Sequence, residues 1–323
     1  MAEAPEHDLE GLIRSDCTAR PILRGPATLP PAGTSSHFMR QPAPNQSLSR
    51  FCLRILTAGD LETKLRPPPA GLPDPFLPSI QPPEQPARSP ELESPQRSTR
   101  LPRPAALFDP EARSQCLARF AHHELMAVEL FAFALLRWPE MPSGLRRTLA
   151  LTLVEEQTHC RLYLERLAAH GHQLGDYPGS NYFWRHVAAI SDSPAGPRAF
   201  LAAMGLTLEQ ANLDFTLLYR DAFRAAGDME SAGVCQRVHD EEIGHVHAAA
   251  RWLDELSPPG TADLEAYRDA VPFPLSLARA KARRFDAPSR RRAGLSEEFI
   301  EAVRVARSSQ ETGRVPSQPK AGT

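Results

Sequence analysis

Long apolar runs are missing from this sequence, and so is a strong excess of either charge. The longest apolar run, residues 130–136, is far shorter than the roughly 20 residues that a membrane-spanning helix needs. The opening MAEAPEHDLEG is acidic and polar, unlike a secretory signal. The net charge is −2, so no overall field attracts nucleic acid. We therefore expect no membrane association.

Cysteine is scarce, and a glycine-rich nucleotide-binding motif is absent. An odd number of scattered cysteines favours reduced thiols in a cytoplasmic location over a disulfide framework. Without a nucleotide-binding motif, electrons for a redox reaction would have to come from an external electron-donor protein. The five cysteines are Cys17, Cys52, Cys116, Cys160 and Cys235.

Proline, in contrast, is abundant in one stretch. Residues 65–104 hold 13 of the 33 prolines, and each proline removes a backbone donor and clashes with a preceding helical turn. We therefore predict a proline-rich linker over residues 65–108, either extended or wrapped over a surface. One short helix is expected before it, at residues 46–64. Residues 1–45 are expected to be disordered or loosely attached.

Residues 109–257 have a helical pattern and no strand pattern. Start and stop signals divide them into four long helices, with a short extra helix at residues 197–204. Two tight turns and one connection of roughly 35 residues join the long helices, which is the connectivity of a ferritin-like four-helix bundle with one long crossover. The predicted fold class is all-α, with a basic C-terminal extension at residues 258–323. The expected long helices are 109–138, 143–170, 207–226 and 228–256.

Two of these helices repeat one motif. VEEQTHCRLYL at residues 154–164 and DEEIGHVHAAA at residues 240–250 each contain a Glu-x-x-His pair. Residues equidistant from a hairpin turn lie side by side, and this places one further glutamate opposite each pair. The spacings from that glutamate are 32 and 33 residues, so each hairpin predicts half of a two-metal site. The halves are Glu124, Glu156 and His159, and Glu209, Glu242 and His245.

Four carboxylates and two imidazoles suit a pair of iron ions, with manganese or a mixed pair as alternatives. The four carboxylates carry −4, which two divalent ions neutralise. Without metal, clustered buried carboxylates would cost several kcal/mol each or take up protons. Glu129 competes with Glu124, and Asp214 competes with Glu209. The spacing favours Glu124 and Glu209. The alternative is a metal-free bundle whose acids face solvent.

The segments HHELMAVEL, VEEQTHCRLYLERL, GDYPGSNYFW, LEQANLD and DEEIGHV resemble a bacterial ferritin-like family known as domain of unknown function 455. That family neighbours the di-iron tRNA-modifying hydroxylases. The resemblance implies the same six metal ligands. It also implies that Glu155 orients His245 and that Glu241 orients His159, because a ligating histidine needs its other N–H held. The usual residue at both positions is Asp, so the reach differs here by one methylene.

Other residues are expected to have less specific roles. Tyr163 lies one helical turn after His159 and is a weak candidate for redox chemistry, although a core aromatic is the simpler interpretation. Cys160 and Cys235 are expected to be buried. Surface or metal-supporting positions are expected for His122, His123, His239 and His247. The aromatics of the crossover, which either cap a substrate entrance or pin the crossover to the bundle, are Tyr177, Tyr182, Phe183 and Trp184.

The expected function is that of an O₂-activating oxidoreductase of the hydroxylase or oxidase type, with O₂ and an unknown substrate as reactants. The alternatives are an iron-handling protein without an organic substrate and a metal-free structural bundle. Residues 279–292 hold seven Arg or Lys and one acid, so contact with RNA phosphates is a further alternative. We expect instead that this segment is solvated and partly disordered.

Overall fold

The computed structural model describes residues 47–69, 71–74, 80–90, 92 and 100–307. The expected disorder of residues 1–45 lies outside this part of the chain. Within it the regular structure is helical, and no β-strand occurs. None of these helices combines the length and apolar character needed to cross a bilayer.

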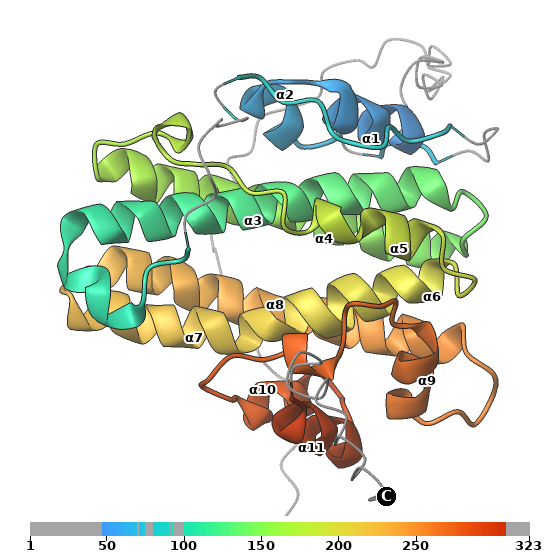
Figure 1. Ribbon diagram of the computed structural model, residues 1–323. Helices are drawn as coiled ribbons and strands as arrows, with labels where there is room; N and C mark the ends of the chain where they lie inside the picture. The colour runs from blue at the N-terminus through green and yellow to red at the C-terminus, as the bar shows by residue number, and fades with distance from the viewer. Residues whose placement is uncertain (1–46, 70, 75–79, 91, 93–99, 308–323) are drawn as a thin grey trace, which may run out of the picture. The chain divides into compact units, whose positions relative to one another are not determined.

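Four long helices form the centre of the molecule, as two hairpins (Figure 1). α3 (Pro110–Arg137) packs against α4 (Ser143–Ala169), and α7 (Gln210–Ala225) packs against α8 (Met229–Glu255). α4 and α8 also pack against each other, which joins the hairpins into one bundle. The connection between them contains η2 (Leu174–Asp176), η3 (Trp184–His186) and α5 (Val187–Ser191).

The helix boundaries follow the signals in the sequence. Asp109 accepts a hydrogen bond from the Glu111 backbone N–H at 3.1 Å and caps α3. Gly171 and Gly227 follow α4 and α7 with φ of 84° and 81°, a backbone conformation that glycine adopts without strain. Asp228 then caps α8 through the Ser231 backbone N–H. These predicted starts and stops are confirmed.

The third long helix differs from the prediction, because it begins ten residues earlier and has no break. α6 (Pro197–Phe200) continues through η4, a π-helix over Leu201–Glu209, into α7. Gly205 lies so close to α8 that an added Cβ would be 2.1 Å from the Ala249 Cβ. The Thr207 hydroxyl donates to the Ala202 carbonyl, five residues back, at 2.7 Å. Tertiary packing of this kind overrides the weak helix propensity of glycine.

The segment before the bundle is folded onto it. Residues 46–64 were expected to form one helix. The described part forms two, α1 (Leu48–Thr57) and α2 (Leu61–Leu65), because Asp60 caps α2 through the Thr63 backbone N–H. α1 packs on α3 and α2 packs on α4. The described proline-rich residues are not helical until η1 (Pro104–Phe108), and they lie against the bundle, where Asp74 pairs with Arg146 at 2.6 Å. This fits the wrapped form of the predicted linker.

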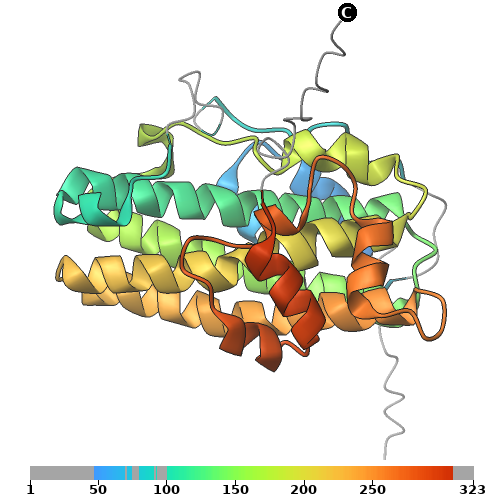
Figure 2. The same cartoon turned by 60° about the horizontal axis from the view of Figure 1, so that its bottom comes forward.

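The C-terminal extension covers the other hairpin (Figure 2). Residues 279–292 were expected to be solvated and partly disordered. Five of their arginines are exposed, but the expected disorder is wrong, since the segment is ordered and includes a helix. Arg290 is fully buried and forms a two-pronged ion pair with Asp214, at 2.7 and 3.0 Å. Arg284 pairs with Asp221, and Arg291 with Glu297. Three of the seven basic residues of this segment are therefore paired with acids of the same chain. The elements are α9 (Asp263–Ala270), η5 (Leu277–Arg279), α10 (Ala287–Arg292) and α11 (Glu297–Val305).

Candidate metal centre

Six side chains, drawn from all four long helices of the bundle, meet in its interior. Their exposed fractions are at most 5%. Their ligand atoms form two groups, and within each group the atoms lie within 4.8 Å of one another. Glu156 and Glu242 occur in both groups, so these two carboxylates can bridge two cations. One group is Glu124, Glu156, His159 and Glu242, and the other is Glu156, Glu209, Glu242 and His245.

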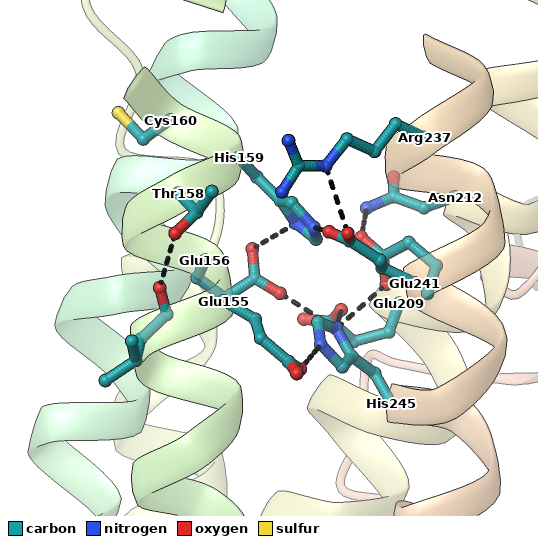
Figure 3. Close-up of polar contacts among 12 residues, drawn as sticks. Glu155, Glu156, Thr158, His159, Cys160, Glu209, Asn212, Arg237, Glu241 and His245 are labelled. Carbon is teal, nitrogen blue, oxygen red and sulfur yellow. Dashed lines mark hydrogen bonds and ion pairs between the residues drawn. The ribbon is translucent and has the colours of Figure 1, made fainter. Parts of the chain in front are cut away.

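The Nε2 atom of each of the two histidines contacts an acid of the opposite hairpin (Figure 3). The His159 Nε2 lies 2.7 Å from Glu241, and the His245 Nε2 lies 2.8 Å from Glu155. These are the two contacts that the family resemblance implies. With Nε2–H donated to a carboxylate, the lone pair of Nδ1 faces the cluster. The His245 Nδ1 is 3.0 Å from Glu156, which lies between the two rings.

Several buried polar atoms of the cluster have partners only within it. In the described part of the chain, the Glu156 Oε1 and Oε2, the His159 Nδ1 and the Glu242 Oε2 form no hydrogen bond of good geometry. The Glu156 oxygens lie 3.0 Å from the His245 Nδ1 and 3.4 Å from the His159 Nδ1, and the Glu242 Oε2 lies 3.4 Å from the His245 Nδ1. These contacts are ion pairs only while the imidazoles are protonated, and a cation in each ligand group would take the place of the protons. The residues present therefore fit two metal ions.

The electrostatics of the cluster lead to the same conclusion. Burial raises the pKa of Glu124 well above its usual value, and the carboxylates of Glu156 and Glu242 raise it further. Burial and these same two neighbours also raise the pKa of Glu209. Burial alone would lower the pKa of His159, but the nearby Glu156 raises it to about 9. Without metal, protons must neutralise this cluster, and metal ions would displace them.

The two competing acids have partners of their own, away from the cluster. Glu129 is fully buried and accepts from Lys64 at 3.0 Å, Arg88 at 2.6 Å and the Trp184 indole at 2.9 Å. Asp214 is neutralised by Arg290. The structure thus brings Glu124 and Glu209, the residues favoured by the spacing, into the cluster and gives Glu129 and Asp214 structural roles.

The remaining histidines lie elsewhere. His122 and His239 are buried, which excludes the surface alternative for both. His239 contacts Thr216 and Ser289 and is not among the ligand groups. His247 contacts the Ala293 carbonyl, in the C-terminal extension. Their local sequence carries no signal for these partners, which come from distant segments.

The aromatic and sulfur residues are mostly core. Tyr163 is buried, and burial raises the pKa of its hydroxyl, which contacts the Cys235 thiol. Cys160 and Cys235 are buried as predicted. Trp184 pins the crossover to α3 through Glu129.

One residue at the cluster was missed in the sequence. The Asn212 amide donates to the Glu242 Oε1 at 3.0 Å. Asn212 belongs to the same continuous helix as Glu209, and Figure 3 labels both residues. The available signal was its position three residues after Glu209, one turn along the same face.

Fold and site together define a class of protein: an all-helical four-rod bundle with a buried cluster of four carboxylates and two imidazoles. The chain belongs to the family described as protein of unknown function (DUF455), whose model matches residues 51–301. The match includes most of α1, all of α2 and most of the C-terminal extension. Neither a curated protein nor a solved structure matches the chain.

Glu155 and Glu241, the acids that contact the two histidines, yield a first prediction. Replacing Glu241 by alanine removes the acceptor of the His159 Nε2–H, so the ring loses its fixed orientation. We expect the affinity for a divalent metal ion to fall about 10- to 100-fold. Competition with a chelator of known affinity measures this change. Glu241→Asp should restore part of it, whereas equal affinities for Glu241→Ala and the native protein would show that the contact has no influence on metal binding.

Proposed function

We propose that this protein is a ferritin-like di-iron carboxylate protein and acts as an O₂-activating oxidoreductase of the hydroxylase or oxidase type. The observation that carries the proposal is the pair of ligand groups that share Glu156 and Glu242. A site built for one ion needs no second group, and a structural role gives no reason to bury four carboxylates together at a cost that protons must offset.

The donor set favours iron, with manganese as the nearest alternative. Carboxylates with imidazole suit these ions, whereas zinc and copper sites are richer in sulfur or nitrogen. Two divalent ions balance the charge of Glu124, Glu156, Glu209 and Glu242. Iron, once bound, supplies the electrons with which O₂ is reduced.

The chain's own residues supply position and exclusion of water. Glu155 and Glu241 fix the two imidazoles, and Asn212 holds one oxygen of Glu242. A small cavity of about 20 Å³ borders Glu209 and His245, with apolar walls that include Phe131 and Phe200. This is about the size of one water-sized probe, so the cavity has room for a diatomic gas beside the cluster. Its apolar walls favour O₂ over water.

A relationship to the di-iron tRNA-modifying hydroxylases remains part of the proposal. RNA as the substrate gains little support from the basic C-terminal segment, since three of its seven basic residues, Arg284, Arg290 and Arg291, pair with acids of the same chain. Electrons are proposed to come from a separate donor protein.

Anaerobic loading with Fe²⁺ followed by O₂ exposure tests the proposal. We expect about two Fe²⁺ per chain and O₂ consumption that is absent from the metal-free protein, followed with an oxygen electrode and by iron absorption. Iron uptake with no O₂ consumption would contradict the oxidoreductase. Accumulation of many more than two ferric ions per chain would indicate iron handling. Fewer than one ion per chain would leave a structural bundle.

The pH dependence of metal-induced stability yields a second prediction. Glu124 and Glu209 have raised pKa values when folded, so the metal-free protein holds protons that the unfolded chain releases, and its stability falls as pH rises. His159 acts in the same direction. Its contribution to the stability of the metal-free protein is complete below 6.5, the pKa of histidine in the unfolded chain, and is lost as pH rises through its folded pKa of about 9. Metal competes with these protons.

We therefore expect the rise in melting temperature on adding Fe²⁺ under anaerobic conditions to grow between about pH 5.5 and about pH 8. Thermal unfolding followed by circular dichroism at each pH, with and without metal, measures it. A rise that is constant or shrinks over this range would mean that metal does not displace protons from the cluster.

A further inference from the structure

A second, larger cavity lies beside the cluster, between α3 and the rod formed by η4 and α7. Its volume is about 220 Å³, on the order of seven times the ~30 Å³ that a water molecule occupies in the liquid. The inner wall is apolar and aromatic, with Phe120 from α3, Leu208 and Phe215 from the η4–α7 rod, and Phe183 from the crossover. A cavity with such walls suits the apolar body of a small organic molecule.

The cavity reaches the cluster through Asn212. This residue lines the cavity and donates to the Glu242 Oε1 at 3.0 Å. Two other lining residues, His123 and Leu208, immediately precede the cluster residues Glu124 and Glu209 in the sequence. A molecule seated here is separated from the cluster by little more than one side chain.

The cavity's rim is cationic. Arg279 and Lys281, from the C-terminal extension, line it, and no Asp or Glu is among the lining residues. Arg279 is exposed and lies over the Tyr182 ring, 5.1 Å from its centroid. Within the described residues it forms no ion pair, unlike Arg284, Arg290 and Arg291. Its guanidinium is therefore available to an anion, and guanidinium groups bind carboxylates through two parallel hydrogen bonds.

We infer that this cavity is the substrate pocket and that the substrate is a small carboxylic acid with an apolar, aromatic-sized body. Arg279 binds the carboxylate at the rim. Phe120, Phe183 and Phe215 enclose the body, which then points its C–H bonds at Asn212 and the cluster. The assignment as a substrate pocket rests on the proposed function, whereas binding of the acid depends only on the cavity walls. The C-terminal extension has a role in this arrangement, since it supplies the cation.

Calorimetric titration of the full chain with 3-phenylpropanoate tests the inference, with the neutral 3-phenylpropan-1-ol as the matched probe. We expect saturable 1:1 binding of the acid. Arg279→Ala should weaken it about tenfold, the loss expected for a charge-assisted contact, and should leave alcohol binding unchanged. Arg283→Ala, which removes a neighbouring exposed arginine, is the matched control and should change neither.

Variants that fill the cavity provide a second test of the inference. Ala211→Phe and Ala278→Phe each place a ring into the space and should abolish binding of both probes, with helicity checked by circular dichroism. No binding of the acid, or equal acid affinity in Arg279→Ala and the native chain, would overturn the inference. Acid binding that persists in both filled variants would overturn it as well.

The titration is carried out on metal-free and on Fe²⁺-loaded protein, so that two failures can be told apart. Acid binding in both, with no iron-dependent O₂ consumption, would refute the oxidoreductase and leave an acid-binding pocket. O₂ consumption without acid binding would refute the pocket and leave the oxidoreductase.

Discussion

Replacing Glu156 by alanine will lower the bound iron from about two ions per chain to fewer than one and abolish iron-dependent O₂ consumption. Glu156 belongs to both groups of ligand atoms, and its oxygens contact only the two histidines of the cluster, at 3.0 and 3.4 Å. Its loss would take one candidate ligand from each group and one of the two carboxylates that the groups share. Metal analysis of protein purified without chelator measures the effect.

Stability gives an independent measure of the same change. A ligand that binds only the folded protein stabilises it by RT ln(1 + [L]/Kd), about 2.7 to 4.1 kcal/mol at 100 to 1,000 times Kd. We expect a chelator to lower the melting temperature of the native chain and to leave that of Glu156→Ala unchanged.

Glu165→Ala is the matched control, since Glu165 is an exposed acid on the same helix, α4. It should retain about two ions per chain and the chelator response. If Glu156→Ala bound as much iron as the native chain, the cluster would not be a metal site and the proposed function would fail with it.

The sequence predicts this cluster of side chains because a set of acids and histidines on a helical hairpin is a local pattern. The Glu-x-x-His spacing places two side chains on one face, and the distance from the turn selects Glu124 and Glu209 over their competitors. The caps at Asp109 and Asp228 are equally local. Each of these inferences needs only residues that are neighbours along one helix or mirror positions across one turn.

What the sequence did not predict depends on partners far along the chain. The π-helix that ends at Glu209 includes the close contact of Gly205 with Ala249, and the ordered C-terminal extension includes the pairing of Arg290 with Asp214. A basic run looks the same whether its charges face solvent or a buried acid. The fold class could therefore be read from the pattern of helices, whereas the elements packed around the bundle could not.

Glu129 is the most consequential of these long-range partners, and its replacement by glutamine should destabilise the protein by about 3–5 kcal/mol. Its carboxylate is the counter-charge of Lys64 and Arg88, and the side chains of all three residues are at most 4% exposed. Glutamine retains the shape and an acceptor oxygen, but it leaves buried cations without a counter-ion. Urea unfolding of the metal-free protein measures the loss.

The loss of stability in Glu129→Gln can be distinguished from a loss of metal binding. Glu129→Gln should retain about two Fe²⁺ per chain at a temperature where it is folded, because its oxygens belong to neither ligand group. Glu124→Gln, five positions earlier on α3, should do the opposite. It should lose metal while the metal-free protein keeps its stability, since Glu124 has a raised pKa and holds a proton rather than a counter-charge.

A second substitution tests the cause of the instability. In Glu129→Gln with Lys64→Met, one of the uncompensated cations is replaced by an apolar side chain of similar length, so part of the lost stability should return. If the double variant were as unstable as the sum of the single variants, burial of an unpaired charge would not be the reason, and the pairing of α2 and the proline-rich segment with α3 through Glu129 would need another explanation.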